Sequence, residues 1–150
     1  MKYRPLGSSG IDVSEVGLGA WQIGGPLKGY FEHMGWISHG WGEVDDAESV
    51  RLVKSCGDAG INFIDTAAGY GAGHSEEVVG RAVKGERDRW VIETKGGEGW
   101  TADNRNWKDF SRARLLAQID ESLTRLDTDH VDVYLLHGPS IEVMTDEVFG

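Results

Sequence analysis

The sequence predicts an α/β fold built on a parallel sheet or barrel, and three observations support this. The chain has 150 residues, the usual size of one domain with its own core. From residue 45 onward, short apolar segments alternate with segments whose apolar residues recur at helical spacing. Glycines or capping residues separate these segments. Strands that alternate with helices in this way form parallel sheets through right-handed crossovers.

The first 44 residues predict a β-hairpin, one strand and a long loop. Two short extended segments, at residues 2–6 and 11–16, are joined by a Gly-Ser-Ser-Gly turn, so residues 1–16 are expected to form the hairpin. The apolar run at residues 16–21 predicts a buried strand. Residues 22–44 are rich in glycine and aromatic side chains without a clear period. Loops of this length are uncommon and are often functional, so we expect this one to cover something apolar.

Three helices then alternate with three strands. Asp45, Ser75 and Ser111 are the expected N-caps of the helices. The strands are expected at residues 61–65, 90–95 and 131–136. An apolar stripe on each helix should face the sheet. The stripe residues are Leu52, Val53, Cys56 and Ala59 in the first helix, Val78, Val79, Ala82 and Val83 in the second, and Leu116, Ile119, Leu123 and Leu126 in the third.

Composition and charge exclude several classes of protein. Fifteen basic and 25 acidic residues give a formal charge of −10, which argues against charge-driven binding to nucleic acid or to an anionic membrane. The sequence contains no apolar run of about 18 residues and no secretory signal pattern. Cys56 is the only cysteine, which excludes an internal disulfide and a multi-cysteine zinc site. We therefore expect a cytoplasmic protein.

The sequence does not favour a metal site or a glycine-rich dinucleotide-binding fingerprint. His33, His39 and His74 share no helical i, i+4 register and have no clustered carboxylate or thiol partners, so we expect solvated loop histidines and no metal. The Gly17-x-Gly19 pair lacks the third glycine and the directly following helix of a dinucleotide-binding fingerprint.

The candidate chemistry lies at the strand ends. Asp65, Lys95 and His137 each stand at or just after the carboxyl end of a predicted strand. In parallel α/β folds these ends share one edge of the sheet, which is where ligands bind. Tyr70 follows Asp65 by five residues in a loop of small residues. We therefore expect these four side chains to share one pocket.

Elementary acid–base chemistry suggests a role for each of the four. A free phenol has a pKa of about 10, so a tyrosine acts as an acid near neutral pH only when a neighbouring cation stabilises its anion. Lys95 beside Tyr70 would supply that cation, and Asp65 would keep Lys95 charged and oriented. His137 would donate a hydrogen bond to a substrate oxygen. A carbonyl polarised in this way is prepared to accept a hydride.

The motifs around these residues resemble a known family. The segments are YRPLGSSGIDVSEVGLGAW, INFIDTAAGYGAGHSEEVVGRAVKGERDRWVIETKGG and DESLTRLDTDHVDVYLLH. Together they closely resemble the aldo-keto reductases, and the resemblance covers essentially all 150 residues. It implies a TIM-type (β/α)8 barrel and NAD(P)H-dependent reduction of aldehydes or ketones, with NADPH as the cofactor and no metal. It also implies a catalytic tetrad of Asp65, Tyr70, Lys95 and His137, with Tyr70 as the general acid.

The resemblance further implies where ligands bind. The residues expected beside the nicotinamide end of the cofactor are Gly19, Ala20, Trp21 and Asp65. Trp21, Tyr70 and His137 are expected to contact a small carbonyl substrate. Trp36 and Trp41 either line the pocket or cover the barrel mouth, and both interpretations stay open. Ala20 stands where the family often has threonine, and Gly138 follows His137 where a larger residue is common. These departures bear on substrate preference more than on the chemistry.

The chain length leads to two alternative functions. An eight-unit barrel needs about 250 residues, whereas this chain is expected to form four units, with the next helix beginning at residues 145–150. Residues 1–150 are therefore expected to be a single partial domain, the N-terminal half of such a barrel. The first function is an NADP-dependent carbonyl reductase. The alternative is a truncated, catalytically weak half-barrel that acts as an assembly or regulatory module. Exposed sheet edges invite pairing with another chain, so we expect self-association, and weak NADPH binding by the 150 residues alone.

Overall fold

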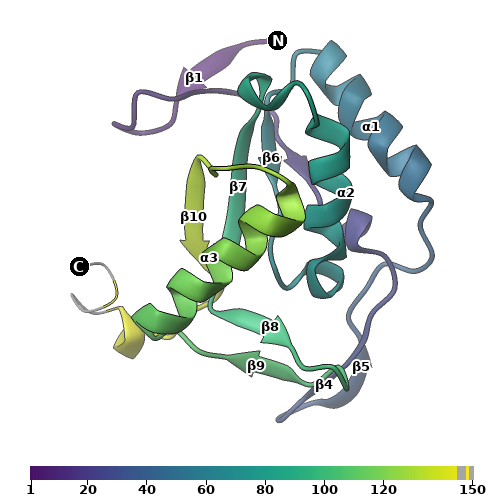
Figure 1. Ribbon diagram of the computed structural model, residues 1–150, viewed down its shortest axis with the longest axis vertical. Helices are drawn as coiled ribbons and strands as arrows, with labels where there is room; N and C mark the ends of the chain where they lie inside the picture. The colour runs from purple at the N-terminus through teal and green to yellow at the C-terminus, as the bar shows by residue number, and fades with distance from the viewer. Residues whose placement is uncertain (145–147, 149–150) are drawn as a thin grey trace.

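The computed structural model describes residues 1–144 and 148. Its centre is a four-stranded parallel sheet with three helices packed beside it (Figure 1). The strands lie in the order β10-β7-β6-β3, with bounds Leu18–Gly19 for β3, Phe63–Asp65 for β6, Val91–Gly96 for β7 and Val133–Leu136 for β10. The helices are α1 (Asp46–Asp58), α2 (His74–Val83) and α3 (Arg112–Leu126). The predicted alternation of strands and helices is confirmed.

All neighbouring strands of this sheet run parallel, so their carboxyl ends lie at one edge. In the register, Asp65 of β6 lies opposite Gly19 of β3 and Glu93 of β7. Lys95 of β7 lies opposite Leu135 of β10. The sheet therefore brings the residues at its strand ends together, as the sequence predicts.

The N-terminal hairpin is also confirmed, with β1 (Tyr3–Pro5) antiparallel to β2 (Asp12–Ser14). Hydrogen bonds attach it to the loop before β6. The Tyr3 hydroxyl donates to the Gly60 carbonyl at 2.8 Å, and the Ser14 amide donates to Asn62 Oδ1 at 2.7 Å. The hairpin therefore lies at the end of the sheet opposite to the carboxyl ends of the strands.

Two of the three predicted helix caps are confirmed. Asp45 Oδ1 accepts from two backbone amides of the first turn of α1, and Ser111 Oγ accepts from an amide of α3. The prediction of Ser75 as the cap of α2 is wrong, because the helix begins at His74 after Gly73, whose φ is 99°. The Ser75 hydroxyl instead donates to the Ala20 carbonyl at 2.7 Å, tying α2 to the end of β3.

The predicted apolar stripe is fully confirmed only for α2, where all four of its residues are buried. In α1, Val53 is buried but Leu52 is 49% exposed. In α3, Leu126 is buried but Leu116 is 52% exposed. The buried face of α3 consists of Leu115, Gln118, Ser122 and Leu126. Gln118 was not recognised because its hydrogen-bond partners, Gly97 and Glu98, lie 21 and 20 positions away in the sequence.

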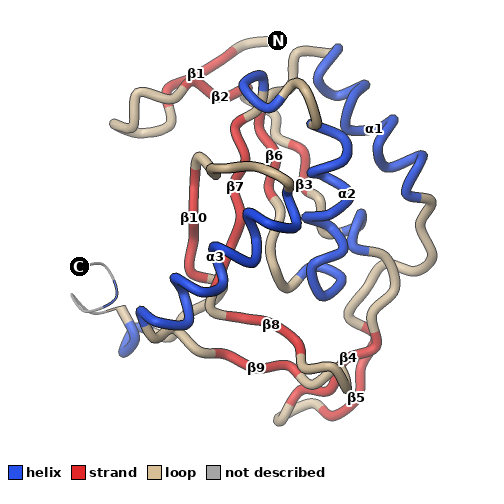
Figure 2. The backbone as a smooth tube through the Cα atoms, viewed as in Figure 1, coloured by secondary structure: helices blue, strands red, loops and turns tan. Residues whose placement is uncertain are grey.

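Hairpins form in two segments outside the central sheet, so the expectation of an irregular loop over residues 22–44 is wrong. Strand β4 (Lys28–Phe31) pairs with β5 (Gly35–Ser38), and β8 (Glu98–Trp100) pairs with β9 (Asn106–Lys108). The two hairpins meet where the Tyr30 amide donates to the Asn104 carbonyl at 2.8 Å. Figure 2 shows them together beyond the carboxyl ends of the sheet strands. The glycine-rich segment therefore covers this end of the sheet, as its aromatic content indicated.

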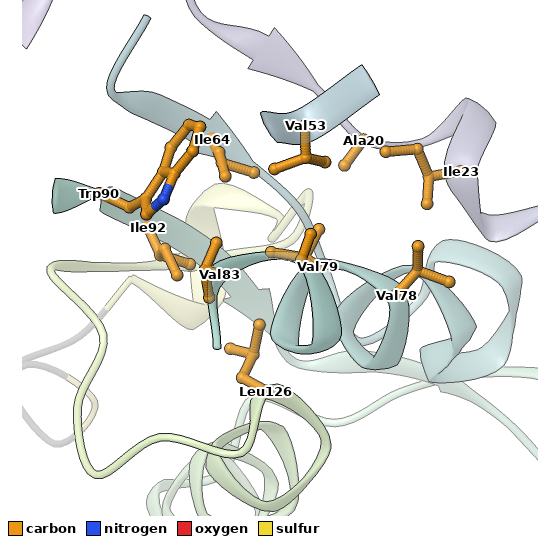
Figure 3. Close-up of a cluster of buried hydrophobic side chains, with 11 residues drawn as sticks. Ala20, Ile23, Val53, Ile64, Val78, Val79, Val83, Trp90, Ile92 and Leu126 are labelled. Carbon is orange, nitrogen blue, oxygen red and sulfur yellow. The ribbon is translucent and has the colours of Figure 1, made fainter. Parts of the chain in front are cut away.

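The hydrophobic core lies between the sheet and α2 (Figure 3). Ile64 of β6 and Ile92 of β7 face the helices and are fully buried. Each such side chain contributes about 1.5–3 kcal/mol on burial. The other core residues are Ala20, Ile23, Val53, Val78, Val79, Ala82, Val83, Trp90 and Leu126. Because side chains alternate along a strand, Asp65, Glu93 and Lys95 project from the opposite face of the sheet.

Two predictions fall outside this description of the fold. Residues 145–147 and 149–150, where the sequence predicts the next helix, lie outside the described residues. The four parallel strands agree with the first half of a barrel, and the partial barrel over residues 1–150 stays a prediction. Within residues 1–144, no helix is long and apolar enough to cross a membrane.

Candidate active site

The structure brings the four predicted residues together at the carboxyl end of the sheet. Asp65 ends β6, Lys95 lies near the end of β7, and His137 directly follows β10. Tyr70 lies in the short turn Tyr70–Gly73 that leads into α2. Three strands and one turn, spread over 73 positions of the sequence, therefore supply one site.

Lys95 connects three of these elements through its ammonium group. Its Nζ donates to Asp65 Oδ1, to the Thr66 carbonyl at 2.9 Å and to the Tyr70 hydroxyl at 3.1 Å. Burial would lower the pKa of Lys95, but the hydrogen bonds to Asp65 and Tyr70 and the charge of Asp65 outweigh burial and raise it. The side chain is 12% exposed. Lys95 is therefore a permanently charged donor held against the phenol.

His137 packs edge-on against Tyr70, with the ring centroids 5.6 Å apart and the ring planes at 86°. Burial lowers the pKa of His137, and Lys95 and Lys108 lower it further, while Glu98 and Asp65 act in the opposite direction. The net effect lowers the pKa of His137 from its ordinary value, which favours the neutral ring. Its Nδ1 is buried and makes no hydrogen bond to any of the described residues.

A pocket of about 160 Å³ joins these residues to an aromatic wall. It is lined by Trp21, His39, Gly69, Tyr70, Glu98 and His137. The Trp21 ring stacks on Tyr70, with centroids 6.1 Å apart and planes at 27°. Trp21 thus lies in the pocket, as expected. Trp36 and Trp41 are not among the lining residues, and both are at least half exposed.

Two of the three loop histidines are not the solvated residues that the sequence predicts. His39 packs among the rings of Trp21, Phe31 and Trp100, with centroids 5.2–5.4 Å away. Burial lowers its pKa. His74 Nε2 lies 2.8 Å from Asp46 Oδ1, while His33 is exposed as expected. Among the described residues, no three or more His, Cys, Asp or Glu side chains are placed to hold a metal ion.

Two glycines set the spacing between the Tyr70 turn and the segment after β3. Gly71 has a φ of +59°, and a Cβ placed there would lie 2.0 Å from the Gly24 carbonyl oxygen. A Cβ on Gly24 would lie 2.8 Å from the Gly71 nitrogen. The two backbones therefore touch directly, which is the arrangement only glycine permits. This contact fixes the turn that carries Tyr70 next to the segment that carries Trp21.

The expected nicotinamide contacts divide into exposed and buried residues. Gly19 is exposed and has open space where a side chain would stand. Asp65 is 39% exposed and Trp21 36%. Ala20 is fully buried, and its amide donates to the Asp65 carbonyl at 2.8 Å. Gly19, Trp21 and Asp65 thus offer surface to a planar ring, while the Ala20 methyl faces the core.

Sequence reasoning missed His39 and Glu98 as pocket residues. His39 stands in a segment without period, and Glu98 follows the glycine pair after the Lys95 strand rather than a strand end. The two hairpins bring both residues to the pocket. The sequence does contain a signal for Glu98. It is an acidic residue directly after the glycine pair Gly96-Gly97, which is typical of a turn at the end of the Lys95 strand.

Comparison with known proteins agrees with this geometry. The chain is 37% identical over 149 residues to aldo-keto reductase YhdN of Bacillus subtilis, which covers 98% of this chain and 41% of that protein. It is 34% identical over 152 residues to the NADH-specific methylglyoxal reductase of Escherichia coli, covering 94% of this chain and 43% of that protein. The chain thus spans less than half the length of these curated relatives.

Solved structures and a family model give the same assignment. The holo form of aldo-keto reductase AKR11C1 from Bacillus halodurans matches with a TM-score of 0.80 at 33% identity, over 99% of this chain and 44% of that chain. The model of the Aldo/keto reductase family matches residues 15–150. The described sheet and helices correspond to part of that barrel fold. The chain therefore belongs to the aldo/keto reductase family of oxidoreductases.

Proposed function

We propose that this chain carries the proton-donating part of a carbonyl reductase site that uses NADPH to reduce aldehydes or ketones. The observation that carries the proposal is the Lys95 ammonium group, which donates to both Asp65 and the Tyr70 hydroxyl. An ammonium group held 3.1 Å from a phenol stabilises the phenolate that forms when the phenol gives up its proton. Tyr70 is thereby the general acid of the proposed reaction.

The other residues support this proton transfer. Asp65 keeps Lys95 charged and points its Nζ toward the phenol, which avoids reorganisation during the reaction. The Thr66 carbonyl accepts a further hydrogen from the same Nζ at 2.9 Å. His137 lines the same pocket and packs edge-on against the Tyr70 ring. A carbonyl oxygen between Tyr70 and His137 would therefore meet the phenol and, when the imidazole carries a proton on the nitrogen that faces it, a second hydrogen-bond donor.

The residues beside the pocket fit the nicotinamide end of a dinucleotide. The open space at Gly19 lets a ring approach the backbone, and Asp65 lines the same pocket as Gly19 with a side chain that is 39% exposed. When bound, the nicotinamide supplies the hydride that adds to the carbonyl carbon. Tyr70 then transfers its hydroxyl proton to the carbonyl oxygen, and Lys95 holds the phenolate that remains.

The pocket dimensions favour a small substrate. Its volume of about 160 Å³ is bounded by the Trp21 and His39 rings. Aromatic walls of this kind exclude water and strengthen the hydrogen bonds to the carbonyl oxygen. We therefore propose small aldehydes or ketones as the substrates.

The test is turnover of small carbonyl compounds with NADPH and, separately, with NADH, followed by dinucleotide absorbance. The Tyr70→Phe variant should lose about 10²–10⁴-fold in kcat because it removes the general acid. It should bind dinucleotide as the parent does. The matched control is Tyr3→Phe, which removes a phenol of the N-terminal hairpin that donates to the Gly60 carbonyl.

The outcomes separate the two functions. Loss of turnover in Tyr70→Phe, with Tyr3→Phe unchanged, supports the reductase. A Tyr70→Phe variant that keeps the full rate overturns the assignment. Absence of turnover with both dinucleotides and a panel of small aldehydes and ketones favours the alternative, an assembly or regulatory module.

A further inference from the structure

Glu98 is a pocket residue to which the proposed reaction gives no role. It begins β8, directly after the Gly96-Gly97 turn that follows β7. Its side chain is 12% exposed and lines the same pocket as Tyr70 and His137. A nearly buried carboxylate in a small aromatic pocket needs partners, so its surroundings indicate what it does.

The position of Glu98 is fixed by hydrogen bonds on two sides. Asn106 Nδ2 donates to Glu98 Oε1 at 2.8 Å. Gln118 of α3, which is 2% exposed, holds the backbone: its Nε2 donates to the Glu98 carbonyl at 2.8 Å, and its Oε1 accepts from the Gly97 amide at 2.8 Å. These bonds hold the backbone and one carboxylate oxygen in place, so Oε2 is presented in a defined direction.

Glu98 Oε2 faces two nitrogen atoms. It lies 3.8 Å from His137 Nδ1 and 3.8 Å from Lys108 Nζ. Lys108 Nζ already donates to the Gly138 carbonyl at 3.0 Å. His137 Nδ1, by contrast, is buried and has no hydrogen-bond partner among the described residues. The histidine nitrogen is therefore the group whose protonation state the carboxylate can decide.

Electrostatics distinguishes the two neutral forms of His137. A proton on Nδ1 places a positive N–H dipole toward the carboxylate, whereas a bare Nδ1 would place a lone pair toward a negative charge. Burial makes this difference larger than in water. Besides Glu98 and Lys108 of the β8–β9 hairpin, the charged groups that act on His137 are Lys95 of β7 and Asp65 of β6. Of the two carboxylates, Glu98 has an oxygen 3.8 Å from Nδ1.

We propose that Glu98 is a positioning residue for His137. Its carboxylate selects the neutral tautomer of His137 that carries the proton on Nδ1 and has no proton on Nε2. In the proposed reductase, His137 would then donate a hydrogen bond from Nε2 to a substrate oxygen only when both nitrogens are protonated. The consequence for catalysis rests on the proposed function. The tautomer itself does not.

The direct test is ¹⁵N NMR of the histidine side chains, recorded well above the pKa of His137. The protein should show a protonated Nδ1 and an unprotonated Nε2 for His137, with the signal assigned from its loss in His137→Asn. In Glu98→Gln, Asn106 keeps the new amide oxygen in place, so the amide NH₂ turns toward His137. It then donates to Nδ1, and the ring proton should move to Nε2.

The matched control is Asp103→Asn, which makes the same charge change on the same hairpin, where the carboxylate pairs with Arg105. This variant should leave the His137 tautomer unchanged. A protonated Nε2 in the unmodified protein, or a Glu98→Gln variant that keeps the proton on Nδ1, would overturn the proposal. The measurement on the unmodified protein decides the question even where Glu98→Gln does not fold.

The kinetic consequence is a second readout. For the unmodified protein, kcat/KM for carbonyl reduction should fall as the pH rises through the pKa of His137, because imidazolium is the donor. Glu98→Gln should lose this fall, since its neutral ring already carries the proton on Nε2. If no form shows turnover, the proposed function fails, and the NMR result still tests the tautomer.

Discussion

The buried ion pair between α2 and α3 provides a stringent test of how this fold is stabilised. Glu76 of α2 is fully buried, and its Oε2 accepts from Arg125 Nε of α3 at 2.6 Å. Its other oxygen accepts from the Thr94 hydroxyl of β7 at 2.6 Å. One carboxylate thus joins two helices to the sheet. We predict that Arg125→Met strongly destabilises the protein, because it leaves this carboxylate buried without a cation.

The magnitude follows from what remains around Glu76. Removing one partner of a buried ion pair costs about 3–5 kcal/mol. The Thr94 hydroxyl still bonds one oxygen, and the N-terminal turn of α2 favours a negative charge by about 0.3–1 kcal/mol. We therefore expect a loss near the lower limit, about 3 kcal/mol. Domains are stable by only about 5–15 kcal/mol, so the loss is large enough to measure.

Urea denaturation followed by tryptophan fluorescence gives the free energy of unfolding of each variant. The control is Lys84→Met, which removes the cation of the exposed Lys84–Asp127 pair, 74% and 65% exposed, and should cause no measurable change. Adding Glu76→Gln to Arg125→Met should recover part of the loss, since a neutral amide costs less to bury. An Arg125→Met variant within about 1 kcal/mol of the parent would refute the reasoning.

Three further predictions address the site, the pH dependence and the assembly. Gly71→Ala should destabilise the protein by about 3 kcal/mol or more in the same denaturation assay, because it combines left-handed backbone strain with a clash against the Gly24 carbonyl. The control is Gly85→Ala, which adds left-handed strain at a φ of +82° in open space and therefore isolates the effect of the clash. Burial lowers the pKa of His39, so the folded state binds a proton less readily than the unfolded state, and the free energy of unfolding should fall as the pH drops below about 6.5. His39→Phe should reduce that fall, and an unchanged pH dependence would contradict this. The 150-residue chain should sediment as a dimer or larger species, because β3 and β10 each pair on one side only within the described residues; a single 16.4 kDa species would contradict this.

The positions of the main elements could be predicted because local signals and the fold agree there. Asp45 and Ser111 cap helices as their chemistry indicates, and the apolar stripe of α2 faces the sheet. The convergence of Asp65, Lys95 and His137 followed from one rule about the ends of parallel strands. Most of the proposed acid–base residues were therefore accessible from the sequence alone.

The features that could not be predicted depend on long-range hydrogen bonds. Ser75 has the residue type of an N-cap, but its hydroxyl bonds to Ala20, 55 positions away. Gln118 occupies a buried position of α3 because it holds the backbone of Gly97 and Glu98. Periodicity places apolar residues at such positions, so it assigned Leu116 to the core in its place. Only the tertiary structure provides the hydrogen-bond partners that allow these polar residues to be buried.

The hairpins were missed for a different reason. Strands β4 and β5 pair with each other outside the central sheet, and neither contributes to the hydrophobic core cluster, so the sequence shows no alternation of apolar and polar residues. Their turn does carry a signal, since Gly35 ends it with a φ of +71°, a backbone conformation that favours glycine. Glu98 and His39 reach the pocket on these hairpins, which is why the sequence did not indicate them.

In the proposed reductase, the direct backbone contact between Gly24 and Gly71 has a consequence for altering substrate range. Because no side chain lies between these two segments, the separation of Trp21 and Tyr70 does not depend on how any rotamer is packed. Libraries that vary Trp21 and His39 would reshape the pocket wall while Tyr70, the proposed general acid, keeps its position. Substitution of either glycine would instead move Tyr70 relative to the pocket wall. Most such variants would lose activity whatever the substrate.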